Sequence, residues 1–282
     1  MKLRFIVTFL YATLCTGMFA QNTPVEKNHF VMRSSTFGIG SSNVYDTYLT
    51  PLEYKGVELR YTHESMRMTK IMKGNVSGQS LFNAHFSMNE NKAETADMYY
   101  GMLSYSYALH YQFKLSEHFK LLAGPYIDIN AGFLYNTRNS NNPAQAKVYS
   151  SIGASGMAIY KFKIRNYPMT VRYQADAAIM GMAFSPQYGQ SYYEIFSLGH
   201  YDHNAVFTSL HNSPSLRQMV TIDFPLGNVV LRAGFTSDVR QFKMNELRSH
   251  AYSNNFMIGF VRNLYRIKGK NKISMPQKYT PF

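Results

Sequence analysis

The chain has 282 residues, of which 45% are hydrophobic and 15% aromatic, and its mean hydropathy is -0.27. Beyond the N-terminus, no apolar run reaches the roughly 20 residues that a membrane-spanning helix needs, which excludes a helical membrane protein. The formal net charge of +13 comes without a basic helix, zinc-finger spacing or RNP-like motif, so no nucleic-acid partner is expected.

The N-terminal segment has the pattern of an export signal. Lys2 and Arg4 form a basic start, an apolar centre follows, and Ala20 precedes the expected cleavage point. We therefore predict a signal peptide at residues 1–20 and one barrel domain at residues 21–282. The single cysteine of the chain falls inside the signal, so the mature chain has no disulfide, catalytic thiol or cysteine zinc site.

The first strands follow the signal. Residues 30–40 predict a strand, residues 41–54 a loop, and residues 55–68 a second strand in which apolar and polar side chains alternate. A third alternating segment covers residues 82–89, and a polar link at residues 90–95 follows it.

The clearest pattern lies between Asp97 and Tyr135, where aromatic or aliphatic side chains occupy every second position on both sides of a polar break at Ser116 and Glu117. This period of two predicts two long strands in an antiparallel hairpin. Each strand exceeds the ~9 to 11 residues that a tilted strand needs to cross a bilayer. A soluble sandwich could alternate in this way too, but the long tyrosine and phenylalanine rows favour a membrane barrel with a polar lumen.

Five more strands complete the series. They are predicted at residues 146–164, 167–179, 216–224, 229–242 and 253–267. The expected fold is therefore all-β, a single antiparallel transmembrane β-barrel of about 10 strands. The alternative is 12 strands, if residues 192–198 and 205–210 form a hairpin of their own.

The lengths of the connections predict an orientation. Short turns are expected at residues 115–118, 165–166 and 226–228, while an Asn-rich link at residues 136–143 and a long link at residues 185–213 lie between them. Outer-membrane barrels have short periplasmic turns and long extracellular loops. We therefore expect an outer-membrane location with both termini in the periplasm.

The polar positions of the alternation predict the lining of the lumen. In a narrow barrel, inward acids and bases are expected to pair and plug the interior, with an open pore or a ligand cavity as the alternatives. The predicted lumen residues are Glu58, Arg60, Glu64, His110, Asp128, Arg172, Asp176, Arg232, Asp238 and Arg240, together with His85, Asn130, Gln174, Arg217 and Asp223.

The long link carries the only candidates for catalysis. Glu194, His200, Asp202 and His203 could supply a general base for a nearby serine. No serine-centred elbow accompanies them, so a loop surface is the preferred interpretation and an enzyme the lesser one. Their spacing suits no standard metal site, and no metal or cofactor is expected.

Three segments of the chain carry a resemblance to a known family. They read GIGSSN through DTYL to PLEY at residues 38–54, NTRNSNNPA at residues 136–144, and FSP through SYYEIF at residues 184–196. Together they resemble a family of uncharacterised outer-membrane barrels from Bacteroidota that is catalogued only as a domain of unknown function. The resemblance implies an envelope location and one barrel spanning nearly the whole mature chain. It implies no activity and no catalytic residue.

The expected function is structural, or the binding of a ligand or partner through extracellular loops. A hydrolase at the rim, of the protease or lipid esterase type, and a small-solute channel are the alternatives. The basic charge suits anionic outer-membrane lipid and lipopolysaccharide, which are the expected partners together with the barrel-assembly machinery. The sequence identifies no ligand.

Overall fold

The computed structural model describes residues 30–140, 142–165, 167–226, 229–266 and 272–274. The predicted signal peptide lies outside these residues. The elements are β1 (Phe30–Asp46), β2 (Thr50–Met68), η1 (Ile71–Gly74), β3 (Val76–Asn91), β4 (Asp97–Lys114), β5 (Phe119–Asn136), β6 (Ala144–Ile164), β7 (Tyr167–Phe184), α2 (Tyr192–Phe196), β8 (Ala205–Ser209), β9 (Ser215–Leu226), β10 (Val229–Met244), β11 (Leu247–Arg266) and β12 (Lys272–Ser274). No helix in this part of the chain is both long and apolar enough to cross a membrane.

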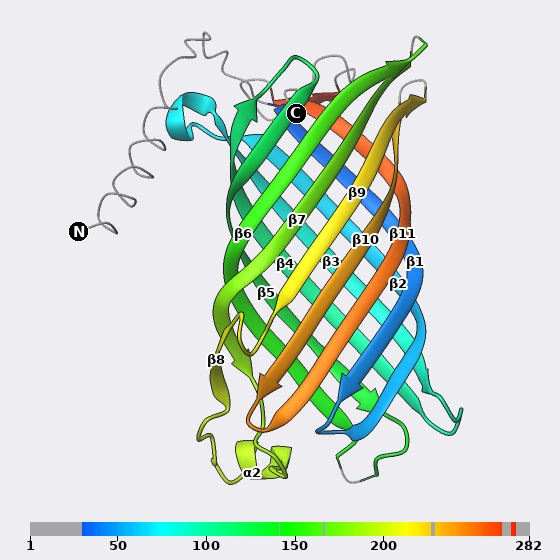
Figure 1. Ribbon diagram of the computed structural model, residues 1–282, viewed down its shortest axis with the longest axis vertical. Helices are drawn as coiled ribbons and strands as arrows, with labels where there is room; N and C mark the ends of the chain where they lie inside the picture. Colours follow the sequence, from blue (N-terminus) through cyan, green and yellow to red (C-terminus); the bar gives the residue numbers. More distant parts are fainter. Residues whose placement is uncertain (1–29, 141, 166, 227–228, 267–271, 275–282) are drawn as a thin grey trace, which may run out of the picture.

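Ten of these strands form a closed antiparallel wall, which confirms the predicted fold class (Figure 1). Each wall strand pairs with its neighbour in the sequence, β7 pairs with β9, and the circle closes where β1 pairs with β11 from Phe30 opposite Tyr265 to Asp46 opposite Ser249. The wall strands run from 12 residues in β9 to 21 residues in β6. The pairing of β1 with β11 joins the ten strands into a circle, as a lipid environment requires of a membrane-spanning sheet.

The two ends of the barrel differ in their connections. The end that holds the start of β1, called the terminal end, carries η1 and the turn at residues 115–118 (Figure 1, top). The opposite end, called the loop end, carries the connections at residues 137–143 and 185–214, the latter with α2 and β8 (Figure 1, bottom). The two predicted long links both lie at the loop end, but the turns at residues 47–49 and 245–246 of that end are short. The terminal end has a longer link at residues 69–75. The predicted asymmetry therefore holds only in part, and it rests mainly on residues 185–214.

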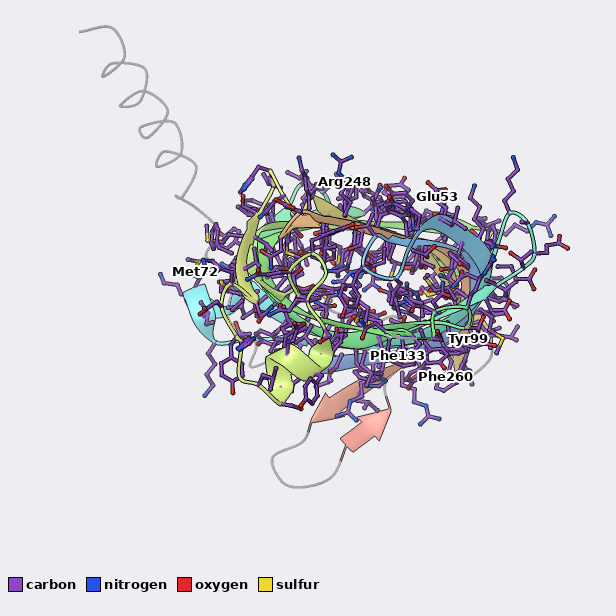
Figure 2. All side chains as sticks on the ribbon, turned by 90° about the horizontal axis from the view of Figure 1, so that it is seen from below. Glu53, Met72, Tyr99, Phe133, Arg248 and Phe260 are labelled. Carbon is purple, nitrogen blue, oxygen red and sulfur yellow. The ribbon has the colours of Figure 1, made fainter. Side chains whose placement is uncertain are left out.

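The outward face of the wall is apolar. Phe256 is 72% exposed, Phe37 is 64% exposed and Ile39 is 59% exposed, and similar side chains continue around β2, β4, β5 and β6. Proteins that face only water rarely expose so extended an apolar surface. Seen along the barrel axis, Tyr99, Phe133 and Phe260 lie at the perimeter of the molecule (Figure 2). The wall therefore has a lipid-facing surface.

The predicted loop at residues 41–54 is wrong in its extent. β1 continues to Asp46 and β2 begins at Thr50, so only residues 47–49 form the turn. Ser42 and Asp46 face the inside of the barrel, whereas Ser41 and Asn43 lie on the outward face, where Asn43 Oδ1 is 3.2 Å from His250 Nε2. Pro51 is tolerated near the start of its strand. Polarity alone was an unreliable sign of a loop here.

The alternative of 12 wall strands is also wrong. Residues 192–196 form the short helix α2, and β8 pairs with β7 rather than with the segment around α2. β8 and β9 run in the same direction along β7, so together they occupy one position in the wall. Residues 210–214 connect them, and there the backbone carbonyls of Asn212 and Pro214 accept hydrogen bonds from Lys243 N and Gln241 N of β10.

Candidate functional site

The interior of the barrel is the candidate site, because it gathers ion-paired side chains from β2, β5, β7, β9 and β10. The structure places all of the predicted lumen residues of the charge network inside, at 9% exposure or less. Figure 2 shows side chains crowding this interior. These residues are Glu58, Arg60, Glu64, His110, Asp128, Arg172, Asp176, Arg232, Asp238 and Arg240.

Glu64 on β2 is the centre of one half of the network. Its carboxylate accepts two hydrogen bonds from Arg172 of β7, from Nη1 at 2.6 Å and from Nη2 at 2.7 Å. Arg232 of β10 also donates to Glu64 at 2.6 Å and forms a bidentate pair with Asp223 of β9 at 2.6 and 2.7 Å. Four strands are thereby joined across the lumen by charge-assisted hydrogen bonds.

Neutral side chains extend this half of the network. Gln79 Nε2 donates to Glu64 at 2.5 Å and to Gln174 at 2.9 Å, and Gln174 donates to Asp176 at 3.0 Å. Asp176 also pairs with Arg217 at 2.7 Å. The two amides thus bridge two ion pairs that would otherwise be separate.

A second half of the network lies closer to the loop end. Arg60 donates to Glu58 at 3.0 Å and lies 3.8 Å from Asp238. Arg240 lies 3.3 Å from Asp238 and 3.1 Å from Asp128. A buried charge left unpaired is strongly destabilising, and here each guanidinium has a carboxylate partner.

His110, Ser155 and Asp176 have the residue types of a nucleophilic triad but not its order. His110 Nε2 lies 2.7 Å from Ser155 Oγ, and Ser155 Oγ donates to Asp176 at 2.5 Å. A serine nucleophile needs the imidazole between hydroxyl and carboxylate, whereas here the hydroxyl lies in the middle. All three side chains are buried in the wall's interior, so this group holds strands together rather than attacking a substrate.

Apolar layers close the interior above and below the charges. These layers were not predicted, because the alternation of the sequence suggested polar side chains inside the barrel. Near the loop end the layer consists of Val44, Leu49, Tyr54, Ala96, Met98, Tyr100, Met102, Leu134, Tyr149 and Ala183. Near the terminal end it consists of Met32, Met66, Leu122, Met157, Ile159, Val230 and Val261.

One signal could have revealed the loop-end layer. Met98, Tyr100 and Met102 continue the phase of Ser104 and Ser106, which face inward on the same strand. The prediction assigned faces by polarity, whereas the phase of the alternation fixes them. Along β4 the inward face therefore changes from apolar to polar.

Three recesses at or inside the described part of the wall are small. They lie at the wall seam, near Arg232 and near Arg217, and hold about 10, 30 and 10 Å³. A water molecule needs roughly 10 to 15 Å³ of such space. The recess near Arg232 therefore has room for two or three waters and each of the others for one at most, so none of the three could hold a larger ligand.

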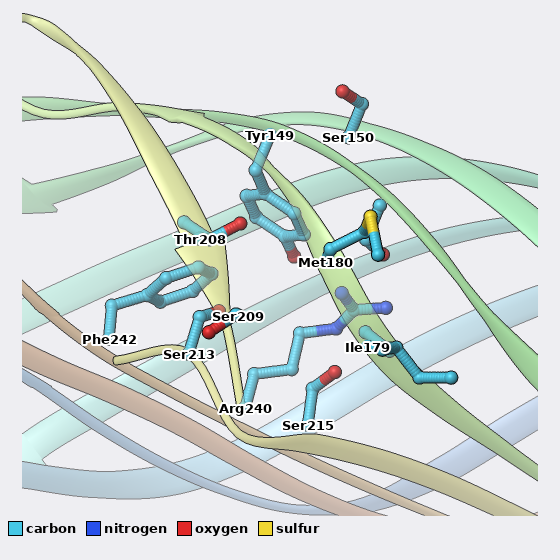
Figure 3. A pocket seen from close by; sticks show the side chains of 12 residues that line it. Tyr149, Ser150, Ile179, Met180, Thr208, Ser209, Ser213, Ser215, Arg240 and Phe242 are labelled. Carbon is cyan, nitrogen blue, oxygen red and sulfur yellow. The ribbon is translucent and has the colours of Figure 1, made fainter. Parts of the chain in front are cut away.

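The recess at the seam lies beside β7, at the point where the pairing partner of β7 changes from β9 to β8 (Figure 3). The guanidinium of Arg240 lies 5.0 Å from the ring centre of Tyr149, with Thr208, Ser209 and Phe242 nearby. Arg240 is already paired with two carboxylates, so the seam presents no unpaired charge to a ligand.

The four catalytic candidates of the long link do not converge. Glu194 closes a capping box on α2: it accepts hydrogen bonds from the backbone N–H of Ser191 at 2.7 Å and from its hydroxyl at 2.8 Å, which lower the pKa of the carboxyl. His200, Asp202 and His203 are exposed. Among the described residues, no three potential metal-binding side chains of the His, Cys, Asp or Glu type lie together.

The segment around α2 is fixed to the rim by aromatic side chains. Ala146 N donates to the Tyr192 hydroxyl at 2.7 Å, and burial raises the pKa of Tyr192 to about 12. Tyr48 donates to the backbone of Gln190 at 3.0 Å. The rings of Tyr192 and Phe196 stack with their centres 5.9 Å apart. The long link is therefore a folded part of the loop end.

Comparison with known proteins gives a family and a set of structural neighbours. A family model described as "Protein of unknown function (DUF3316)" matches residues 3–271, and no curated protein matches. The transport unit of the autotransporter AIDA-I from Escherichia coli is 11% identical, with 91% of this chain and 97% of that chain covered and a TM-score of 0.46. The outer membrane protease OmpT from Escherichia coli is 7% identical, with 86% and 98% covered and a TM-score of 0.47. Ail, the attachment invasion locus protein of Yersinia pestis, is 10% identical, with 82% and 97% covered and a TM-score of 0.27.

Proposed function

Because the chain belongs to the DUF3316 family and folds as a closed barrel with a lipid-facing wall, we propose that it is an outer-membrane protein that binds ligands or partners through its loop end. The lumen is plugged, the long loops are extracellular, and both termini are periplasmic. The barrel-assembly machinery inserts it into the membrane. The Bacteroidota origin that the resemblance implies remains a prediction.

The sealed interior is the observation that carries this proposal. Two apolar layers enclose a network in which ion pairs connect carboxylates and arginines of many strands. Ions would have to cross both layers and displace these pairs, at a desolvation cost of several kcal/mol for each buried charge. Because the interior disfavours transport, we assign the binding of ligands or partners to the loop end.

Conductance in planar bilayers tests the plug. We expect the refolded protein to give no stable current steps at neutral pH. Steady, ohmic steps would contradict the proposal and favour the small-solute channel. A variant shortened between residues 186 and 203 should fold and stay electrically silent, because those residues form the loop end and not the plug.

The hydrolase alternative has less support, because Glu194 is used by the helix cap and the other candidates are exposed and separate. Hydrolysis of a phospholipid or peptide that is lost in His200→Ala, Asp202→Asn or His203→Ala would favour it over a binding role.

A further inference from the structure

Three arginines face outward on neighbouring strands close to the terminal end. They are Arg33 on β1, Arg67 on β2 and Arg262 on β11, and all three are exposed. Arg33 and Arg262 stand directly opposite each other in the β1–β11 pairing. Arg67 stands opposite Val31, two residues from Arg33 along β1. The three arginines therefore occupy neighbouring positions on one face of the wall, and together they are called the arginine patch.

The arginine patch lacks a counter-charge in the described part of the chain. No ion pair there includes any of the three residues, and like charges directly opposite on a sheet destabilise it. The carboxylates of the lumen face the other side of the wall. The exposed or partly exposed acids lie at the loop end or in the turn between β4 and β5, and they are Glu53, Glu90, Glu94, Asp97, Glu117, Glu194, Asp202 and Glu246.

The charge balance of the molecule also indicates that the arginine patch has no internal counter-charge. The ion-paired interior and rim hold seven carboxylates and six cations, so the whole basic excess of the chain lies outside them. Within residues 1–29 and 267–282, Glu26 is the one acidic side chain that the sequence offers. An external anion is therefore the natural counter-charge for the arginine patch.

The position of the patch indicates the kind of anion. On the same outward face, toward the middle of the barrel, β1 and β11 carry the exposed apolar side chains Phe37, Ile39 and Ile258. On β1 and β2, polar groups lie between the apolar side chains and the arginines: Ser35 Oγ is 3.0 Å from His63 Nδ1 and 3.3 Å from the Tyr61 hydroxyl. On β11 the aromatic Phe260 occupies this position. A change from apolar to polar to cationic along the wall matches the change from acyl chain to headgroup in a bilayer.

We propose that the arginine patch binds an anionic phospholipid that carries two phosphates, with one phosphate between Arg33 and Arg262 and the other at Arg67. Guanidinium groups suit phosphate because they donate two parallel hydrogen bonds to it. Arg262 lies 5.2 Å from the ring centre of Phe260, which holds its side chain against the wall. The choice of a phospholipid rests on the proposed orientation, in which the terminal end faces the periplasmic leaflet.

Native mass spectrometry of the refolded protein in detergent, with cardiolipin, phosphatidylglycerol or phosphatidylethanolamine added, tests the proposal. We expect cardiolipin to be retained most strongly and Arg33→Gln/Arg262→Gln to retain it about tenfold less, the loss that removing charge-assisted hydrogen bonds brings. Arg33→Lys/Arg262→Lys should lie between the two, because it keeps the charge and loses the bidentate geometry.

The matched control removes another cationic pair of the same kind. Lys243 and Arg248 stand opposite each other on β10 and β11 at the loop end, with Glu246 in the adjacent turn. Lys243→Gln/Arg248→Gln should retain cardiolipin like the unchanged protein. Equal loss in both double variants, or equal retention of phosphatidylethanolamine, would overturn the proposal.

A preference for lipid A over cardiolipin would overturn the phospholipid assignment. The measurement is made in detergent and does not depend on the sidedness of the protein. A negative result for lipid binding at the arginine patch can therefore be distinguished from a negative result for the proposed orientation or plug. Cysteine labelling tests the orientation, and conductance tests the plug.

Discussion

At the scale of single residues, Glu64 is the side chain on which most of the interior pairing depends. It accepts hydrogen bonds from Arg172, Arg232 and Gln79, and it is 1% exposed. Glu64→Gln removes the charge that two arginines share. We expect the free energy of unfolding in detergent to fall by about 3 to 5 kcal/mol, since a buried pair is broken on one side only.

Urea titration followed by the gel mobility of folded and unfolded forms measures this change. The control is Glu53→Gln, an exposed glutamate on the same strand, which should shift the midpoint little. An unchanged midpoint in Glu64→Gln would mean that the network does not stabilise the barrel.

At the scale of elements, α2 depends on its cap because a helix of five residues has little stability of its own. Ser191→Ala removes the hydroxyl that accepts from Glu194 N and should destabilise the local fold by about 1 kcal/mol. Faster hydrogen exchange at residues 192–196, with exchange in the wall strands unchanged, is the expected result.

The same cap predicts a pH dependence. Hydrogen bonds from Ser191 lower the pKa of Glu194 in the folded loop. The charged carboxylate therefore stabilises the folded loop fully above the pKa of an unfolded glutamate. This stabilisation is lost as the pH falls through the lower pKa of the folded loop. The protection factors of the α2 amides, which are corrected for the intrinsic pH dependence of exchange, should fall in acid, and Glu194→Gln should remove this dependence. A pH response that persists in Glu194→Gln would assign it to another group.

The interrupted strand formed by β8 and β9 gives a second prediction at this scale. Met180 pairs with Ser209 and Ala177 with Leu216, so the chain between the two pairs has four residues more on the β8–β9 side than on β7. Deleting residues 210–213 should bring both strands into one continuous register, and the barrel should still fold. Heat-dependent gel mobility checks this, and a matched deletion of residues 217–220 inside β9 should abolish folding.

At the scale of the whole molecule, the difference between the two ends makes the orientation testable. The single cysteine lies in the predicted signal peptide, so new cysteines in the mature chain are unique labels. Asp202→Cys at the loop end should react with a membrane-impermeant maleimide on intact cells, and Ser116→Cys at the terminal end should react only after lysis. The reverse pattern would place the termini outside.

The wall of this barrel was predictable from the sequence because its causes are local. In β4, the alternation from Tyr99 to Phe113 fixes the period, and the length of the strand fixes the bilayer as the setting. The inward position of Glu64 or Asp128 follows from that period alone. The bounds of the loops were less secure, because the polar residues before Asp46 lie on both faces of the strand and resemble a loop in composition.

The identity of each partner across the lumen was decided only by the tertiary structure. Glu64 and Arg232 are 168 residues apart, and no local pattern says that β2 and β10 place them together. The same holds for Met98 and Tyr100, which face inward and pack against apolar side chains from other strands at the same level of the barrel. Strand period is a property of neighbouring residues, whereas closure, register and the fit of side chains inside a narrow cylinder belong to the whole chain at once.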